Sequence, residues 1–250
     1  MEHDERERDR RDLALACRVL AHRRLVDDVL GHVSLRVDDD RLLVRCRGPH
    51  ERGLRFTMPS DIRLVGLGNA RVLDDESGSW RPPAELPIHT ELLRARRDLR
   101  AVVHAHPRAV VAASLAELPL LPIVGAFDIP AMRLAEAGIA TYPRSVLIHR
   151  TELGHELVGA MGHADACVLA GHGLVTAGAT IAGAVLRALA VDSLARLSLD
   201  VVHAGGRLKP IAERDRAELP DLGSAFNEEL LWRHHLACLD GNGWGLDDDA

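Results

Sequence analysis

Two histidines separated by one alanine, His104 and His106, have a spacing that would allow them to act together in a chemical site. The apolar segment 101–103 leads into them and Pro107 follows, which indicates a short β-strand. Because side chains alternate along a strand, both imidazoles would lie on one face and could share a metal ion. Two polar residues at the end of a strand would show the same pattern, so the pair alone leaves both interpretations open.

A third histidine, His172, lies between two glycines directly after the apolar segment 167–170. Glycines permit a tight bend that would turn His172 toward a neighbouring strand. An ordinary turn histidine is the alternative, but the His-x-His strand upstream favours a ligand. We therefore predict that His104, His106 and His172 bind one divalent metal ion per chain. Three neutral imidazoles with an open position suit Zn²⁺, which we favour, and also Mn²⁺, Fe²⁺ or Co²⁺.

One carboxylate, Glu85, lies at the start of a predicted helix that runs from about Arg81 to about Arg97. Prolines precede it, and proline is tolerated in a first helical turn. A glutamate at this end of a helix could be only a surface group that the helix dipole favours. Beside a metal site it could also move a proton. His89 follows one turn later on the same face, and we interpret it as a packing histidine.

Short strands and helices alternate along the rest of the chain, which indicates an α/β domain. We predict one domain at 12–239, after a charged N-terminal arm at 1–11 and before a mobile, Asp-rich tail at 240–250. Strands are predicted at 33–37, 42–44, 64–67, 101–106, 146–148 and 167–170, and helices from 13 onward and at 81–97, 109–115, 151–161, 180–203 and 228–239.

The composition restricts the classes of function. Hydrophobic residues make up 47% of the 250 residues but aromatic residues only 3%, so leucine, valine and alanine must build the core. A formal net charge of −6 disfavours general nucleic-acid binding. The charged N-terminus is no apolar signal segment and no apolar run is long enough to span a membrane, so we expect a cytoplasmic protein without membrane association. Four widely spaced cysteines indicate reduced thiols: Cys17, Cys46, Cys167 and Cys238.

The order of these motifs resembles the class II aldolase/adducin family. The family pattern includes the Glu-x3-His pair at Glu85, the His-x-His run at 99–107 and the glycine-flanked His172, and the similarity covers about 12–205. The resemblance implies a three-layer α/β/α fold whose central, mostly antiparallel sheet is flanked by helices. It also implies a small-molecule substrate, Glu85 as the catalytic acid/base, and a homotetramer with sites between subunits. Four residues are open candidates for reaching a neighbour's site: Asp128, Tyr142, His234 and His235.

In this family a Gly-Asn-x-Ser-x-Arg stretch contributes to the substrate pocket, and residues 31–36 resemble it. His32 stands where the family has asparagine, and Ser34 and Arg36 match the pattern. The resemblance therefore implies substrate contacts for all three, and Arg36 could bind a substrate carboxylate. The alternatives are a turn role for His32 and an ion pair between Arg36 and a nearby aspartate.

Two departures from the family pattern argue against a phosphorylated substrate. Phosphate-binding members tend to have Pro-Ser-Gly or Pro-Thr-Gly where this chain has a Pro-Ser-Asp sequence at 59–61. Asp61 thus puts a negative charge beside Ser60, which is another predicted substrate residue. Such members also often carry serines before the catalytic glutamate, where this chain has Pro83 and Ala84. We therefore expect a non-phosphorylated acid as substrate.

These features predict a metal-dependent carbon–carbon lyase. A three-histidine metal site can hold two adjacent substrate oxygens and stabilise the enediolate that forms when a carbon–carbon bond breaks, and Glu85 would move the proton. Because the Gly-His-Val-Ser stretch at 31–34 resembles decarboxylating relatives, we predict decarboxylation of a hydroxy-oxo or dihydroxy-aromatic acid. Class II aldolase cleavage of a hydroxy acid or sugar phosphate is the alternative. Iron-dependent oxygenation and a non-catalytic, adducin-like interaction role are further alternatives, although adducin-like members lack the metal histidines.

Overall fold

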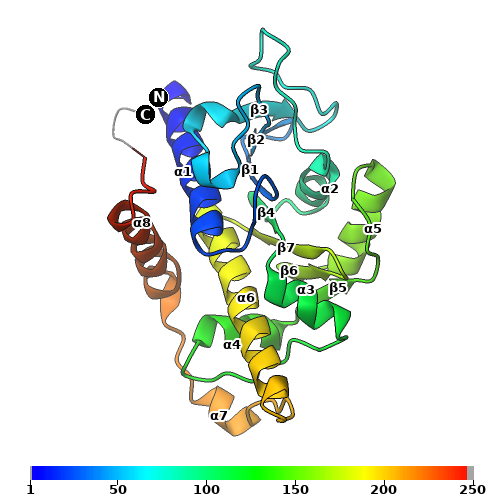
Figure 1. Cartoon of the computed structure of the whole chain (residues 1–250), viewed down its shortest axis with the longest axis vertical. Helices are drawn as coiled ribbons and strands as arrows, with labels where there is room; N and C mark the ends of the chain where they lie inside the picture. Colours follow the sequence, from blue (N-terminus) through cyan, green and yellow to red (C-terminus); the bar gives the residue numbers. More distant parts are fainter. Residues whose placement is uncertain (1, 247–250) are drawn as a thin grey trace.

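Seven strands form one sheet through the middle of the structure, and helices cover both of its faces (Figure 1). The computed structural model describes residues 2–246. Five neighbouring strand pairs are antiparallel and β5 runs parallel to β6, which confirms the predicted α/β fold with a mostly antiparallel sheet. The strand order is β3-β2-β1-β4-β7-β6-β5, and the strands are β1 His32–Arg36, β2 Arg41–Arg45, β3 Ile62–Gly66, β4 Ala101–Ala105, β5 Ala140–Tyr142, β6 Ala166–Leu169 and β7 Gly173–Gly178.

The sheet separates the two largest clusters of buried hydrophobic residues. Side chains of α1, α3, α6 and α8 contribute to the core on one face of the sheet, whereas α2 and α5 build the core on the other face. The helices are α1 Glu2–His22, α2 Leu86–Ala95, α3 Arg108–Leu115, α4 Ile129–Ala137, α5 Thr151–Met161, α6 Ile181–His203, α7 Glu213–Ala217 and α8 Leu231–Gly241, with short turns η1 Leu54–Phe56 and η2 Pro59–Asp61 and a π-helical turn η3 Ala225–Leu230. Within residues 2–246, no helix has both the length and the apolar character needed to cross a membrane.

Strand β4 shows how side-chain alternation places the candidate residues. Val103 packs into the core that α1 and α6 share, whereas Val102 packs into the core of α2 and α5. His104, two residues after Val102, therefore faces the layer whose helix α2 begins next to Glu85. Strand β1 lies beside β4 in the register His32↔His104, so His32 is the direct cross-strand neighbour of His104.

Two predicted elements between the motifs differ in the structure. The helix predicted from Arg81 begins only at Leu86, so Glu85 occupies the N-cap position rather than the first turn. Pro87 would lie in the second turn of a helix that began at Arg81, where its missing N–H and its ring disrupt the helix, whereas a start at Leu86 places it in the first turn. The segment 146–148 is not a strand, and β5 instead forms the sheet edge next to β6. A physical reason is that the N–H of Ile148 donates to Glu85 and is not available to a strand partner.

The two ends of the chain are better packed than the sequence predicts. Residues 1–11 were expected to form a solvated arm, but α1 begins at Glu2 and the Arg10 guanidinium pairs with Asp74 at 2.6 Å. Within the segment predicted as a mobile tail, Leu246 is buried. The Arg18 guanidinium donates to the backbone carbonyl groups of the two residues before Leu246, Trp244 and Gly245. The remaining tail, 247–250, lies outside the described residues.

Gly173 of β7 lies against the end of β4 with no room for a side chain, and we expect Gly173→Ala to destabilise the protein. An added Cβ would lie 2.5 Å from the carbonyl oxygen of Ala105 and 2.9 Å from Cδ2 of His106. Such overpacking costs roughly 1–3 kcal/mol of unfolding free energy, which urea denaturation would measure. Gly159→Ala is the matched control, because a Cβ on that exposed position of α5 meets no atom within 4 Å. An unchanged urea midpoint for Gly173→Ala would contradict the close approach.

Candidate metal centre

Four side chains from separate parts of the sequence converge at one end of the sheet: Glu85, His104, His106 and His172. Glu85 lies at the N-cap of α2, His104 on β4, His106 just after β4, and His172 in the turn between β6 and β7. One potential ligand atom of each lies within 4.8 Å of those of the others. Within residues 2–246 this group could hold a metal ion, and it contains the three histidines that the motifs single out.

The histidine ring nitrogens are arranged as metal ligands require. Nδ1 of His104 donates to the carbonyl oxygen of Leu174 at 3.1 Å, so a neutral ring would offer an unprotonated Nε2 to a metal ion, and this nitrogen faces the other three groups. Nε2 of His106 lies 2.8 Å from Nε2 of His104. Burial and the neighbouring rings of His104 and His172 lower the pKa of His106 to about 3, so this imidazole is neutral. The buried Nδ1 of His172 has no such backbone partner among the described residues.

The Glu85 carboxylate is held by both of its oxygens. Oε1 accepts the N–H of Ile148 at 2.9 Å, and Oε2 lies 3.2 Å from Nε2 of His104 and 3.5 Å from Nε2 of His172. Burial on its own raises the pKa of this carboxyl. The two histidines and the Ile148 N–H together outweigh burial and hold the pKa of Glu85 well below its usual range. Glu85 is therefore an ionised carboxylate inside a largely buried site.

This donor set fits a divalent transition metal ion. Nε2 of His104 and Nε2 of His106 face each other at hydrogen-bond distance, and a cation between such lone pairs removes their mutual repulsion. Three imidazoles and one carboxylate match the ligands that Zn²⁺ and similar ions prefer. His104 and Glu85 are buried, whereas His106 and His172 keep part of their surface exposed. The cluster is thus open on one side, where a small molecule could enter.

Two of the predicted substrate residues, His32 and Ser34, lie beside the cluster, and both contact His89. The ring centre of His32 is 5.0 Å from that of His104. Nδ1 of His32 lies 2.6 Å from Nε2 of His89, and the Ser34 hydroxyl lies 2.6 Å from Nδ1 of His89. The interpretation of His89 as a packing histidine missed this polar contact. The sequence did contain a signal for this contact, because a residue one helical turn after Glu85 faces the same strands. Helix periodicity, however, does not identify which side chain His89 contacts.

The other two predicted substrate residues lie elsewhere. The Arg36 guanidinium donates to the carbonyl groups of Leu93 and Arg96 at the C-terminal end of α2. The backbone N–H of Arg36 donates to the carbonyl of Arg100. Arg36 therefore lies about 13 Å from His104 along the strand direction, at a rise of 3.3 Å per residue. Its placement does not support a substrate contact. Ser60 is exposed and lines a separate cavity of about 310 Å³.

The candidates for a neighbour's site have contacts within their own chain. Tyr142 is buried and its hydroxyl donates to Glu156 at 2.9 Å. Asp128 caps α4 by accepting the N–H of Ala131 at 3.0 Å. His234 and His235 are neighbours on α8, with ring centres 5.3 Å apart.

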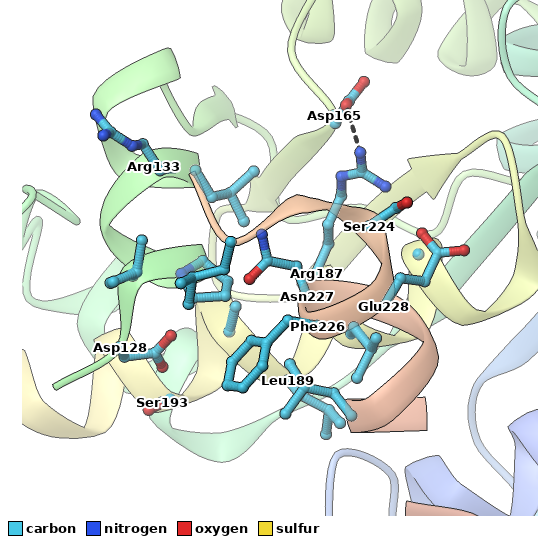
Figure 2. Close-up of a pocket in the computed structure, with 18 of the residues that line it drawn as sticks. Asp128, Arg133, Asp165, Arg187, Leu189, Ser193, Ser224, Phe226, Asn227 and Glu228 are labelled. Carbon is cyan, nitrogen blue, oxygen red and sulfur yellow. Dashed lines mark ion pairs between the residues drawn. The ribbon is translucent and has the colours of Figure 1, made fainter. Parts of the chain in front are cut away.

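A cavity of about 760 Å³ lies away from the cluster, between α4, α6 and the segment 222–235 (Figure 2). Figure 2 shows Arg187, which pairs with Asp165 at 3.1 Å, and Phe226 among its lining residues. None of the four cluster residues lines it. The converging ligand atoms, and not cavity size, mark the candidate site, because size alone supplies no chemistry.

Comparison with known proteins adds family information to this geometry. A family model described as the class II aldolase and adducin N-terminal domain matches residues 11–199. The chain is 57% identical over 229 residues to 3,4-dihydroxyphthalate decarboxylase of Arthrobacter keyseri, across 91% of this chain and 92% of that protein. It is 47% identical to the Rhodococcus jostii protein of the same name, across 90% and 93%. L-fuculose 1-phosphate aldolase from Glaciozyma antarctica has the same fold, with a TM-score of 0.78 at 21% identity, across 98% of this chain and 95% of that one.

We expect purified wild-type protein to carry one transition metal ion per chain, measured by elemental analysis. His172→Ala removes one of the converging nitrogens and should lower metal occupancy to near zero after dialysis. His155→Ala is the matched control, because His155 is exposed on α5 and its imidazole pairs with Glu91 of α2, away from the cluster. Equal metal content in His172→Ala and wild type would refute the assignment of His172 as a ligand.

Proposed function

This chain belongs to the class II aldolase and adducin family, and we propose that it is a metal-dependent lyase that removes one carboxyl group, as CO₂, from a dihydroxylated aromatic dicarboxylic acid such as 3,4-dihydroxyphthalate. The observation that carries the proposal is the convergence of Glu85 and three histidines in a chain so similar to named decarboxylases. The substrate class comes from those relatives, and the chemistry comes from the cluster.

The metal ligands in this proposal are His104, His106 and His172, and Zn²⁺ is the ion that their neutral imidazoles suit best. When bound, such an ion would supply Lewis-acid stabilisation of negative charge on two adjacent substrate oxygens. The Leu174 carbonyl keeps the proton of His104 on Nδ1 and so keeps Nε2 available. Burial of this nitrogen excludes competing water on the core side.

Glu85 is the proton carrier in the proposed reaction. Its ionised carboxylate accepts the proton of a substrate hydroxyl as the substrate binds. The bond between the ring carbon and the carboxylate then breaks, CO₂ leaves, and the electron pair stays on the ring carbon. Glu85 returns the proton to that carbon, and the phenolate that remains takes one proton from solvent as the product leaves, so the product is a dihydroxybenzoate. Because the Ile148 N–H holds Oε1, the other oxygen, Oε2, faces the reacting atoms.

A sugar-phosphate aldolase is the alternative within the family, and one contact argues against it. The Asp61 carboxylate accepts the N–H of Met58 at 2.8 Å. A phosphate at this loop would need such backbone N–H groups, and here a carboxylate of the chain already uses one. A non-catalytic, adducin-like role has less support, since all four cluster residues are in place.

We also propose a homotetramer in which a neighbouring copy covers the mouth of the site. Leu115 is 72% exposed and Leu147 is 54% exposed. Leu147 precedes Ile148, the partner of Glu85, and Leu115 lies beside the loop of His172, where a Cβ on Gly171 would be 3.4 Å from it. Large apolar side chains exposed at the rim of a polar site are typical of surfaces that another subunit buries.

Glu85→Gln should reduce kcat for 3,4-dihydroxyphthalate decarboxylation about 10²- to 10⁴-fold, because an amide cannot accept and return the proton. The assay measures CO₂ release and dihydroxybenzoate formation. Glu91→Gln is the matched control: Glu91 is a buried carboxylate on the same helix, but its partners are Arg94 and His155. A wild-type enzyme loaded with metal that releases no CO₂ would refute the proposed reaction.

Sedimentation of the wild type should give four times the mass of the 27.2 kDa chain. Leu115→Glu places a charge in the proposed interface and should shift the protein toward smaller species. Leu73→Glu, a change at an exposed leucine in the turn after β3, should leave the tetramer intact. A wild type that sediments as a monomer at micromolar concentration would rule out this assembly.

A further inference from the structure

Three side chains next to the cluster form a continuous hydrogen-bonded chain that the proposed mechanism does not use. The Ser34 hydroxyl contacts Nδ1 of His89, and Nε2 of His89 contacts Nδ1 of His32, both at 2.6 Å. Ser34 and His89 are completely buried, and His32 retains 5% of its surface. Ser34 and His32 lie on the face of β1 that packs toward α2, where His89 is located.

The direction of the hydrogen bonds follows from the Ser34 hydroxyl. Within residues 2–246 its hydrogen-bond partner is Nδ1 of His89, and a buried hydroxyl hydrogen needs an acceptor. Ser34 therefore donates to Nδ1 of His89. Burial, with the nearby ring of His104, lowers the pKa of His89 to about 3, so the ring is neutral and carries its one hydrogen on Nε2. That hydrogen is donated to Nδ1 of His32.

The consequence for His32 is a defined tautomer. Because Nδ1 of His32 accepts a hydrogen bond, the neutral ring carries its hydrogen on Nε2. No hydrogen bond to Nε2 of His32 exists in the described part of the chain. This N–H is thus a donor without a partner in the protein, on a ring whose centre is 5.0 Å from that of His104.

We propose that Ser34 and His89 are positioning residues that fix His32 as a hydrogen-bond donor, and that the Nε2–H of His32 recognises a carboxylate of the substrate. This inference rests on the proposed function, because it assumes an aromatic acid at the metal centre. A single neutral N–H suits a carboxylate oxygen, whereas a phosphate requires several donors.

The same geometry excludes a proton relay through these residues. A relay must be resupplied from solvent, but the chain ends at Ser34, which is completely buried between β2 and β4. Its function is therefore orientation, and proton transfer stays with Glu85.

Binding to the metal-loaded enzyme tests the recognition, with catechol, 2,3-dihydroxybenzoate and 3,4-dihydroxybenzoate as probes in titration calorimetry. Each of the two acids retains a different one of the two carboxylates of 3,4-dihydroxyphthalate, and catechol retains neither. In Ser34→Ala the fixed donor direction is lost, so at least one acid should bind about tenfold more weakly while catechol is unaffected. Ser34→Thr, which retains the hydroxyl, should bind that acid more tightly than Ser34→Ala. Equal weakening of all three probes, or of none, would overturn the inference.

Histidine ¹⁵N NMR of the wild-type holoenzyme tests the tautomer without any variant that must fold. His32 should show a protonated Nε2 and an unprotonated Nδ1, with its signal identified by its loss in His32→Gln. A protonated Nδ1 would overturn the positioning role even if the enzyme decarboxylates. If none of the three probes binds the wild type, the proposed function fails together with carboxylate recognition, and the NMR result still reports on the hydrogen-bonded chain.

Discussion

The register of β4 between β1 and β7 is the constraint on which the rest of the site depends. Backbone hydrogen bonds pair His104 with His32 on one side and with Val175 on the other. A slip by one residue would turn His104 to the opposite face and bring Val103 toward Glu85. Because Val102 and Val103 are buried in different cores, such a slip would disrupt both of them. Apolar packing thus holds the histidines in place.

The polar side chains of the site are held by backbone atoms that have hydrogen-bonding capacity left beyond the helix and strand pattern. The Leu174 carbonyl orients His104, and the N–H of Ile148 orients Glu85. Burying a carboxylate is costly unless it is hydrogen-bonded or paired, and here both conditions are met. The segment 146–148 does not pair as a strand, and its Ile148 N–H instead holds the Glu85 carboxylate. A rigid carboxylate beside a metal site is the arrangement that proton transfer to carbon requires.

Two separate features of this fold support the proposed preference for an acid without phosphate. At the loop before β3, Asp61 occupies a backbone N–H that an anionic group could otherwise bind. At β1, the family asparagine is replaced by His32, which the buried His89 and Ser34 orient. The first feature disfavours one class of substrate, and the second provides a donor for another. Both features lie outside the set of metal ligands.

Local motifs, together with the family resemblance that they carry, were sufficient to predict the cluster and much of the fold. The His-x-His strand, the glycine-flanked His172 and Glu85 each carry their signal within a few residues, and the helix α6 matches its predicted range almost residue for residue. Only the tertiary structure could reveal that Ile148 holds Glu85, that His89 joins Ser34 to His32, and that Arg36 caps the end of α2. These contacts join residues 55 to 63 positions apart, and periodicity describes only near neighbours. The packed N-terminal segment and the tail up to Leu246 were missed for the same reason: their charge predicts solvation, and only the folded chain supplies the partners that bury them.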